Sequence, residues 1–263
     1  MSESKGKRRK SPMSLCAVGD SGGMEVNMYS NGCIICGKDL IYFSSAKRIK
    51  CSICGKEFET NASCIEGHFV CDMCHSQPAL LSITACALTT GSKSPVTIAV
   101  NMMKEKSINM HGPEHHYLIV ASLLSAYKNS GGDIDLEKAL LMARQRSINV
   151  PGGICGMWGS CGAGIGTGMF VSIITEATPL SVEEWGNANL ATSKSLYDIA
   201  KNGGPRCCKR NTLLSIMSAI DTAKDITGIQ MEKPGSIKCS FFIKNPTCKK
   251  EKCPYYPMKT SLQ

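Results

Sequence analysis

Residues 152–170 read GGICGMWGSCGAGIGTGMF, a stretch in which two cysteines and a tryptophan stand among repeated glycines. Glycine has no side chain to clash, so the backbone can bend sharply and other groups can approach it closely. Cys155 and Cys161 therefore stand on a loop suited to hold a ligand or substrate. The apolar residues 169–174 predict a helix whose free N-terminal N–H groups face whatever the loop holds.

The same glycines also fit a purely structural interpretation. Glycines at every second position from 162 to 168 could let two helices pack closely, and cysteine is often a small buried apolar residue. The stretch does not spell a nucleotide-binding loop, because GxGxxG would need glycine at Thr167 or Met169 and GxxxxGK[ST] occurs nowhere. The cluster of special residues favours a functional site.

Composition predicts a globular protein of one or two domains in a reducing compartment. The chain has 263 residues, 43% of them hydrophobic, and 16 cysteines. The basic run at residues 5–10 is followed by polar sequence instead of an apolar signal-peptide core, and no apolar run is long enough to span a bilayer. We therefore expect a cytoplasmic protein without membrane contact, whose paired cysteines bind metal in preference to forming disulfides.

The net charge of +9 is concentrated at the two ends of the chain. Residues 1–12 carry +4, residues 233–263 carry +6, and the remainder sums to −1. A nucleic-acid-binding core would carry its basic residues in the body of the protein. The basic ends could contact a polyanion, but solvated tails are the simpler explanation, and we expect residues 1–30 to be disordered.

Four pairs of potential metal ligands lie between residues 33 and 75. Their spacing, with glycine directly after Cys36 and Cys54, is typical of zinc knuckles, in which backbone N–H groups point at thiolate sulfur. Eight ligands match two closed tetrahedral zinc sites with structural roles. The eight are Cys33, Cys36, Cys51, Cys54, Cys64, His68, Cys71 and Cys74.

The order of these ligands resembles that of treble-clef and RING-type modules. Cys51/Cys54, a short hairpin over 58–70 and Cys71/Cys74 at the start of a helix over 78–88 would make one treble-clef unit. The other four ligands would close a second site in the alternating order of a cross-brace. This resemblance rests on ligand spacing, so it implies a fold and not an activity.

Beyond residue 91 the pattern becomes helical, with no internal repeat and few strand signals. Ser94 and Pro95 predict a helix start as N-cap and first residue, and Asp133 or Asp135 predicts another cap. Apolar residues at helical spacing predict the remaining helices. The helices are expected to begin near residues 95, 113, 135, 163, 181 and 205.

Three of the five histidines fall within HGPEHH at residues 111–116. With Pro113 as first helical residue, His115 and His116 lie in the first turn, where the helix dipole lowers imidazole pKa and favours the neutral form that binds metal or accepts a proton. Glu114 could orient an imidazole or act as an acid or base. The alternative is that these polar groups only cap the helix start and that the histidines are surface or satisfied core residues. It is supported by the absence of the HExxH spacing of a zinc-binding helix. We count His111 with the other three as candidate catalytic residues.

The run GGPRCCKR at 203–210 predicts a second reactive helix start. Because basic residues flank Cys207 and Cys208, we expect a thiol there to have a lowered pKa and to be nucleophilic or ligating. Neighbouring helical residues point about 100° apart, so only one of the two cysteines should face the site. The other is expected in the core.

The C-terminal segment spaces its cysteines as Cys239-x8-Cys248-x4-Cys253, followed by proline. Three cysteines with proline after the last are typical of iron–sulfur ligand runs, although the spacing matches no ferredoxin motif. A third zinc site is an equal alternative. The fourth iron could stay open for substrate, or a fourth ligand could come from the helical part: Cys155, Cys161, Cys207 or Cys208.

Taken in order, the motifs CxxCG, CxxCG, GHFVCDMCH, HGPEHH, GGICGMWGSCGAGIG, GGPRCCKR and CPYY resemble an uncharacterised domain family of anaerobic archaea and bacteria. The resemblance covers nearly the whole chain after residue 30. It implies that some relatives join this domain to a radical-SAM or methyltransferase-like module, and hence work on a one-carbon or sulfur-transfer pathway. This chain has no CxxxCxxC triad, so radical-SAM chemistry by the chain itself is not implied.

The sequence therefore predicts a mainly α protein with an N-terminal two-zinc module. We expect a basic tail (1–30), the zinc-binding module (31–90), a helical domain (91–232) and a Cys-rich basic segment (233–263). The favoured function is a metal- and thiol-dependent enzyme for sulfur- or methyl-group transfer on an unidentified small or carrier-bound substrate. The alternative is a non-catalytic zinc-binding adaptor that recruits RNA or a protein partner.

Overall fold

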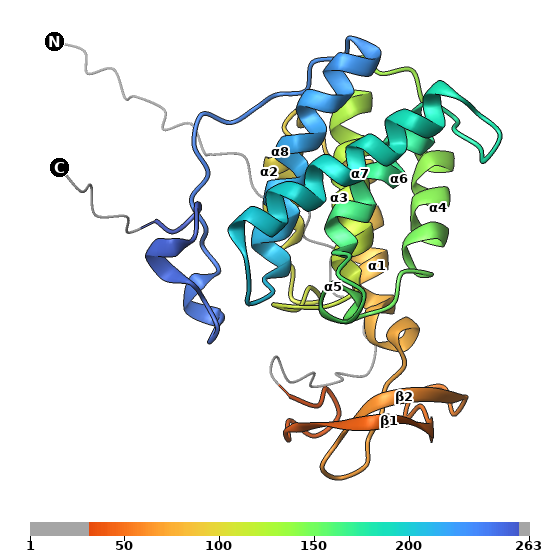
Figure 1. Ribbon diagram of the computed structural model, residues 1–263, viewed down its shortest axis with the longest axis vertical. Helices are drawn as coiled ribbons and strands as arrows, with labels where there is room; N and C mark the ends of the chain where they lie inside the picture. The colour runs from red at the N-terminus through yellow and green to blue at the C-terminus, as the bar shows by residue number, and fades with distance from the viewer. Residues whose placement is uncertain (1–31, 258–263) are drawn as a thin grey trace, which may run out of the picture.

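The computed structural model describes residues 32–257 of the chain. A two-stranded sheet lies below a helical bundle in Figure 1, and a C-terminal segment lies beside the bundle. The fold is thus mainly helical, as predicted. The expected disordered tail and the last residues of the basic C-terminal segment lie outside the described residues.

The element order shows how the bundle follows the sheet. The strands are β1 (Leu40–Lys50) and β2 (Glu57–Cys64). The α-helices are α1 (Asp72–Thr89), α2 (Pro95–Met102), α3 (Glu114–Asn129), α4 (Leu136–Ser147), α5 (Ile154–Met157), α6 (Gly162–Ile174), α7 (Glu183–Asn202) and α8 (Cys208–Thr227), followed by the 3-10 turns η1 (Phe242–Lys244) and η2 (Lys250–Lys252).

Two predicted helix caps are confirmed by their hydrogen bonds. The Ser94 hydroxyl accepts from the backbone N–H of Thr97 at 3.4 Å at the start of α2. Asp135, and not Asp133, caps α4 by accepting from the N–H of Lys138 at 3.1 Å. Each side chain satisfies a donor that the first helical turn leaves free.

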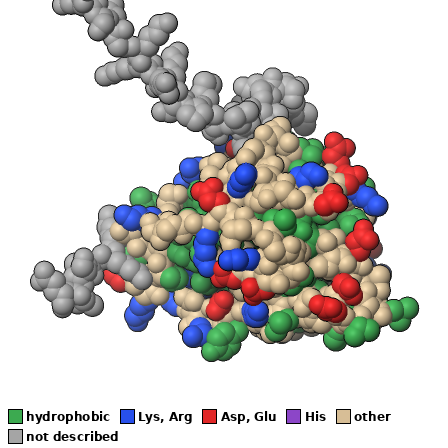
Figure 2. Space-filling view, turned by 90° about the horizontal axis from the view of Figure 1, so that it is seen from above, with side chains coloured by type: hydrophobic (Ala, Val, Ile, Leu, Met, Phe, Trp, Pro, Cys, Tyr) green, Lys and Arg blue, Asp and Glu red, His purple; other side chains and the backbone are tan. Residues whose placement is uncertain are grey.

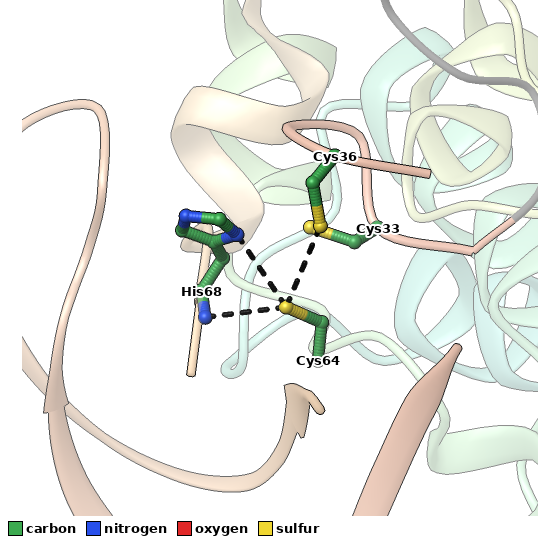
Figure 3. A group of neighbouring side chains, drawn as sticks. All are labelled: Cys33, Cys36, Cys64 and His68. Atoms are coloured by element: carbon green, nitrogen blue, oxygen red, sulfur yellow. Dashed lines mark hydrogen bonds between the residues drawn. The ribbon is translucent and has the colours of Figure 1, made fainter. Parts of the chain in front are cut away.

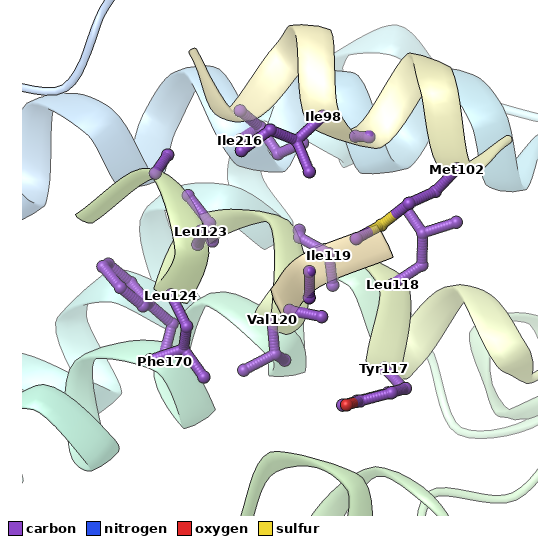
Figure 4. Close-up of a cluster of buried hydrophobic side chains, with 14 of the residues drawn as sticks. Ile98, Met102, Tyr117, Leu118, Ile119, Val120, Leu123, Leu124, Phe170 and Ile216 are labelled. Carbon is purple, nitrogen blue, oxygen red and sulfur yellow. The ribbon is translucent and has the colours of Figure 1, made fainter. Parts of the chain in front are cut away.

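Helix α3 is the centre of the bundle, and every residue from Glu114 to Tyr127 is buried. It contacts α1, α2, α4, α6 and α8, so all of its faces are covered. A helix covered all round must be apolar all round, which its YLIVASLLSAY sequence satisfies. Figure 4 shows the resulting core, in which side chains of α2, α6 and α8 meet those of α3: Ile98, Met102, Leu118, Leu123, Phe170 and Ile216.

The glycines of α6 serve close helix packing. A Cβ on Gly164 would lie 2.6 Å from the Leu196 side chain, and one on Gly168 would lie 2.0 Å from the Thr192 hydroxyl oxygen, both on α7. Only glycine lets the two helices approach this closely. The structural interpretation therefore applies to this half of the glycine-rich stretch, whereas residues 152–161 form a loop around the short helix α5.

The N-terminal sheet corrects the expected hairpin over 58–70. Strand β2 pairs antiparallel with the preceding β1, so that Lys50 lies opposite Glu57 and the Cys51 knuckle forms the turn between them. Strand β1 was not predicted. Nearly all of its residues are exposed, so its sequence lacks the alternation of apolar and polar residues that indicates a strand. The helix expected over 78–88 begins six residues earlier, at Asp72.

Two connections hold the peripheral parts to the bundle. Helix α1 starts among the predicted metal ligands and ends in the core, and the Asp72 carboxylate accepts from the N–H of Gly152 at 3.1 Å. The C-terminal segment returns to the level of the N-terminus of α8 (Figure 1), where the Lys249 ammonium donates to the carbonyl of Asn202. Both connections reach the end of the bundle where the candidate site lies.

The described residues contain no candidate membrane span, and the face seen in Figure 2 carries charges of both signs. Within residues 32–257 no helix is both long and apolar enough to cross a bilayer. Figure 2 shows Lys and Arg side chains interspersed with Asp and Glu over one face of the bundle. Such mixing differs from the basic stripe of a nucleic-acid-binding face.

Candidate functional site

The first metal group consists of Cys33, Cys36, Cys64 and His68, whose ligand atoms lie within 4.8 Å of one another. Figure 3 shows the three sulfurs and the imidazole pointing toward one point. The Cys64 sulfur lies 3.9 Å from the Cys36 sulfur and 3.5 Å from Nδ1 of His68. Four such donors around one point can hold a metal ion in a closed tetrahedron.

The second metal group consists of Cys51, Cys54, Cys71 and Cys74, again within 4.8 Å. The sulfurs of Cys54 and Cys71 are 3.9 Å apart. The structure thus brings the eight predicted ligands together in the two groups that their order indicated. Side chains from the turn of the sheet and from the start of α1 meet here, so a metal ion at this point would join the two elements.

Repeated backbone turns place the ligands. The N–H of Gly37 donates to the carbonyl of Cys33 at 2.7 Å, and the N–H of Gly55 donates to that of Cys51 at 2.9 Å. Both glycines have positive φ, 74° and 69°, which ordinary residues adopt at a cost. Burial opposes ionisation of Cys51, but N–H groups at its sulfur prevail and lower its thiol pKa to about 6, which favours the ligating thiolate.

A cavity of about 50 Å³ lies at the end of the bundle where α3, α6 and α8 begin. Its volume admits a few water molecules or the reacting end of a substrate, but not a whole cofactor. The short helix α5 and its glycine-rich loop form the remaining wall. We call it the thiol cavity after the predicted residues that line it: His115, His116, Cys155, Cys161 and Cys208.

Both histidines of the thiol cavity are held by backbone carbonyls. Nδ1 of His115 lies 3.1 Å from the carbonyl oxygen of Gly112, and Nδ1 of His116 lies 3.1 Å from that of Val150. Burial lowers the pKa of each imidazole, so both are neutral and Nδ1 donates the hydrogen bond. Nε2 then carries the lone pair, and that of His115 is buried without a partner.

The N-terminus of α6 fits closely against His116. A Cβ on Gly162 would lie 2.3 Å from Nε2 of His116, so this position requires glycine. Cys161 is the N-cap residue of α6, but its side chain makes no capping hydrogen bond. Its sulfur accepts from the side-chain amide of Asn211 at 3.4 Å. The free N–H groups of this first turn therefore face the cavity.

Glu114 and His111 lie behind the cavity wall and do not line it. Glu114 is fully buried, one oxygen accepts from the N–H of Asn109 at 3.1 Å, and burial raises its pKa. The side chain of Asn245 lies near His111, and burial is the main cause of the lowered pKa of this imidazole. These two predicted residues can support the site but do not face a substrate there.

The prediction of a lowered thiol pKa at 207–208 is wrong. Burial raises the pKa of Cys208 to about 12, although the N–H of Gly112 and the guanidinium of Arg206 act in the opposite direction. Burial also raises the pKa of Cys207 against the N–H of Arg210. The sequence indicated the nearby positive charges but could not show that both thiols are removed from water, and desolvation outweighs the charges.

Comparison with known proteins gives one result for these residues. Residues 83–256 match the model of a family described as Family of unknown function (DUF5714). The chain belongs to this DUF5714 family. The match includes all residues of the thiol cavity and the C-terminal cysteines, whereas the eight ligands of the two metal groups precede it. No curated protein and no solved structure matches the chain.

The DUF5714 part also brings Cys207 to the C-terminal cysteines. Burial raises the thiol pKa of both Cys207 and Cys239. Negative charge on the nearby Cys248 and Cys253 raises the pKa of both thiols further. Cys207 therefore faces this group while Cys208 faces the cavity, which corrects the expectation that one of the two belongs to the core. The C-terminal cysteine group is Cys207, Cys239, Cys248 and Cys253.

Lys209 is a functional candidate that sequence reasoning missed. Its side chain is only 1% exposed, its ammonium has no hydrogen-bond partner, and it lies 5.1 Å from the centre of the Phe241 ring. Burial lowers its pKa to about 8. A signal was present, because Lys209 stands four residues before Leu213 on the apolar face of α8.

Proposed function

We propose that this DUF5714 protein is a metal-dependent enzyme whose reaction centre is the thiol cavity. The observation that carries the proposal is the convergence of two neutral imidazoles and three thiols, brought from distant parts of the chain, on one small cavity. Such convergence of polar groups in a recess is the usual arrangement of a reactive site.

Zinc is the metal that best suits the two N-terminal groups. One offers three thiolates and one imidazole, the other four thiolates, and both are complete donor sets for a structural zinc ion. The hairpin around them is almost entirely exposed, so metal bonds would replace the missing apolar core. These ions would have no open position, so the chemistry is assigned to the thiol cavity.

The side chains of the thiol cavity can divide the work of a group transfer. Cys161 lies at the N-terminus of α6, whose free N–H groups would stabilise a negative charge on its sulfur. The unpartnered Nε2 of His115 would accept the thiol proton. The sulfur of Cys161 would then bond to the transferred group, and the donor would leave with the electron pair of the broken bond.

Transfer of a sulfur atom or a methyl group is the reaction class that we favour. Cys155 and Cys208 place two further thiols in the same cavity, which could receive or release such a group. The small volume suits the end of a carrier or small molecule, and the exposed Met157 and Trp158 within the loop offer a surface to the rest of that molecule.

A second candidate, a zinc-binding adaptor, is favoured by exposed apolar side chains on the hairpin. Ile41 and Tyr42 on β1 are 41% and 74% exposed, and Lys47 and Arg48 follow on the same strand. Aromatic residues next to basic ones suit an RNA or an acidic protein partner. In that case the thiol cavity would be a structural feature only.

Mapping the reactive thiols of the native full chain distinguishes the two candidates. The protein is treated without oxygen with methyl iodide or, separately, inorganic polysulfide, and modified cysteines are identified by mass spectrometry. We expect Cys161 to react first and His115→Asn to slow it about 100-fold. Equal reactivity of Cys161 and Cys248, with no effect of His115→Asn, would overturn the enzyme proposal and favour the adaptor.

The hydrogen bond of residue 115 provides the control for that variant. Asparagine at 115 can still donate to the carbonyl of Gly112, as Nδ1 of the histidine does, but it offers no basic nitrogen. A matched His116→Asn variant shows whether the second imidazole contributes. Unchanged circular dichroism and metal content in both variants confirm that any loss of reactivity is local.

A further inference from the structure

The C-terminal cysteine group joins residues from two parts of the chain. Cys207 caps α8 in the bundle, whereas Cys239, Cys248 and Cys253 lie in the segment after it. Cys207 interacts electrostatically with Cys248 and Cys253, and Cys239 interacts with the other three. The side chain of Asn245, between these cysteines in the segment, reaches the Cys207 sulfur at 3.7 Å.

Backbone N–H groups already surround these sulfurs. The sulfur of Cys207 accepts from the N–H of Arg210 at 3.5 Å. The sulfurs of Cys239 and Cys248 accept from the N–H groups two residues onward, each at 3.4 Å. Such N–H···S contacts stabilise negative charge on sulfur, so they suit thiolates that ligate a metal.

A buried cation, the ammonium of Lys209, lies next to the group. The ammonium of Lys209 makes no hydrogen bond and is 1% exposed. It interacts electrostatically with Glu114 and Cys208 first, and then with Cys207 and Cys239. Burying an ammonium is costly unless negative charge lies nearby. A metal centre with four thiolates would add to the negative charge that Glu114 offers, and Lys209 would offset it.

The spacing of the sulfurs separates this group from the two N-terminal groups. Around one zinc ion, bonds of about 2.3 Å hold the thiolates within about 4 Å of one another. Among the described residues only the two N-terminal groups bring three or more ligand atoms within 4.8 Å, and the C-terminal cysteine group does not. An iron–sulfur cube holds each thiolate on a different iron atom, so its ligands stand farther apart.

We propose that Cys207, Cys239, Cys248 and Cys253 bind a [4Fe–4S] cluster that fastens the C-terminal segment to the start of α8. This site is independent of the proposed reaction in the thiol cavity. Its ligand Cys207 precedes Cys208, which lines that cavity, so the cluster and the cavity share the first turn of one helix. A closed set of four cysteines leaves no iron open to substrate.

Iron and sulfide analysis of paired variants tests the cluster. The full chain is purified without oxygen, reconstituted with ferrous iron and sulfide, and assayed for iron, acid-labile sulfide and zinc. We expect about four iron atoms and about four sulfide ions per chain, with a reduced-state paramagnetic resonance signal. Cys207→Ser should lose most of both, whereas Cys208→Ser, the adjacent thiol that faces the cavity, should keep them.

Three outcomes would overturn the proposal. One is a third zinc ion per chain that Cys207→Ser removes, with no iron, because the group would then be a zinc site. Another is a chain that binds neither iron nor a third zinc ion. The last is iron that survives both Cys207→Ser and Cys239→Ser. Circular dichroism and retention of the two N-terminal metal ions identify a variant that has simply failed to fold.

Discussion

The N-terminal module and the helical domain use cysteine in opposite ways. In the module, ligands separated by two or three residues are gathered by glycine turns, and the surrounding strands are exposed. In the helical domain, Cys155, Cys161 and Cys208 come together only because α3, α6 and α8 pack around a large apolar core. Metal would therefore be the core of one region, whereas in the other the core comes first and the thiols are placed by it.

Removal of metal should unfold the N-terminal module but not the helical domain, which is the largest difference expected between the two regions. Structural zinc contributes about 10–16 kcal/mol to small zinc modules. A chelator should therefore abolish hydrogen-exchange protection of β1 and β2 but leave most of the helical circular dichroism. Cys51→Ser should act likewise, with Cys155→Ser as the control that keeps both ions. Protection of the strands that persists without metal would contradict the comparison.

Truncation of a core side chain should show the reverse dependence. Leu118 on α3 is fully buried, so Leu118→Ala should lower the free energy of unfolding of the helical domain by about 2–5 kcal/mol. Tyr42 on β1 is 74% exposed, and Tyr42→Ala should change it by less than about 0.5 kcal/mol. Urea titration followed by helical circular dichroism measures both, and similar losses would show that the core is not confined to the bundle.

A pair of glycine variants sharpens the account of the glycine-rich stretch. Gly168→Ala forces a methyl group toward Thr192 and should cost about 1–3 kcal/mol. Gly186 on α7 has no atom within 4 Å of an added Cβ, so Gly186→Ala should gain about 0.5–1 kcal/mol from helix propensity. Thermal unfolding ranks the two, and equal effects would refute close packing of α6 on α7.

Acid should weaken the helical domain through its buried histidines. Burial lowers the pKa of His115 well below its ordinary 6.5, so below pH 6.5 the unfolded chain binds a proton that the folded chain does not. Stability is therefore complete above pH 6.5 and falls with pH, by at most about 1.4 kcal/mol per pH unit for this group. His115→Asn should flatten that slope.

Tryptophan fluorescence can follow this transition without interference from the module. Trp158 and Trp185 are the two tryptophans of the chain, and both belong to the helical domain. In acid the metal ligands of the module also gain protons and release the metal. Release of this metal should leave the tryptophan fluorescence unchanged. An identical pH slope in His115→Asn and the unsubstituted protein would show that His115 does not titrate as described.

Sequence patterns predicted the features that depend on near neighbours in the chain. Ligand spacing gave both metal groups, and Ser94 was recognised as a helix cap. The pattern failed at β1, where no face is buried, and at the thiols of residues 207 and 208, where burial reversed the expected pKa shift. Those errors share a cause, because the extent of burial depends on segments far away in sequence.

What the sequence by itself determined is which side chains could act and which of them form local turns. Only the tertiary structure decided that Cys208 faces the thiol cavity, that Cys207 faces the C-terminal cysteines, and that Lys209 is buried between them. Cys208 and Lys209 point about 100° apart around α8, and Cys207 precedes them as the N-cap with an extended backbone. Their surroundings are fixed by the contacts of α8 with distant segments, which no local pattern encodes.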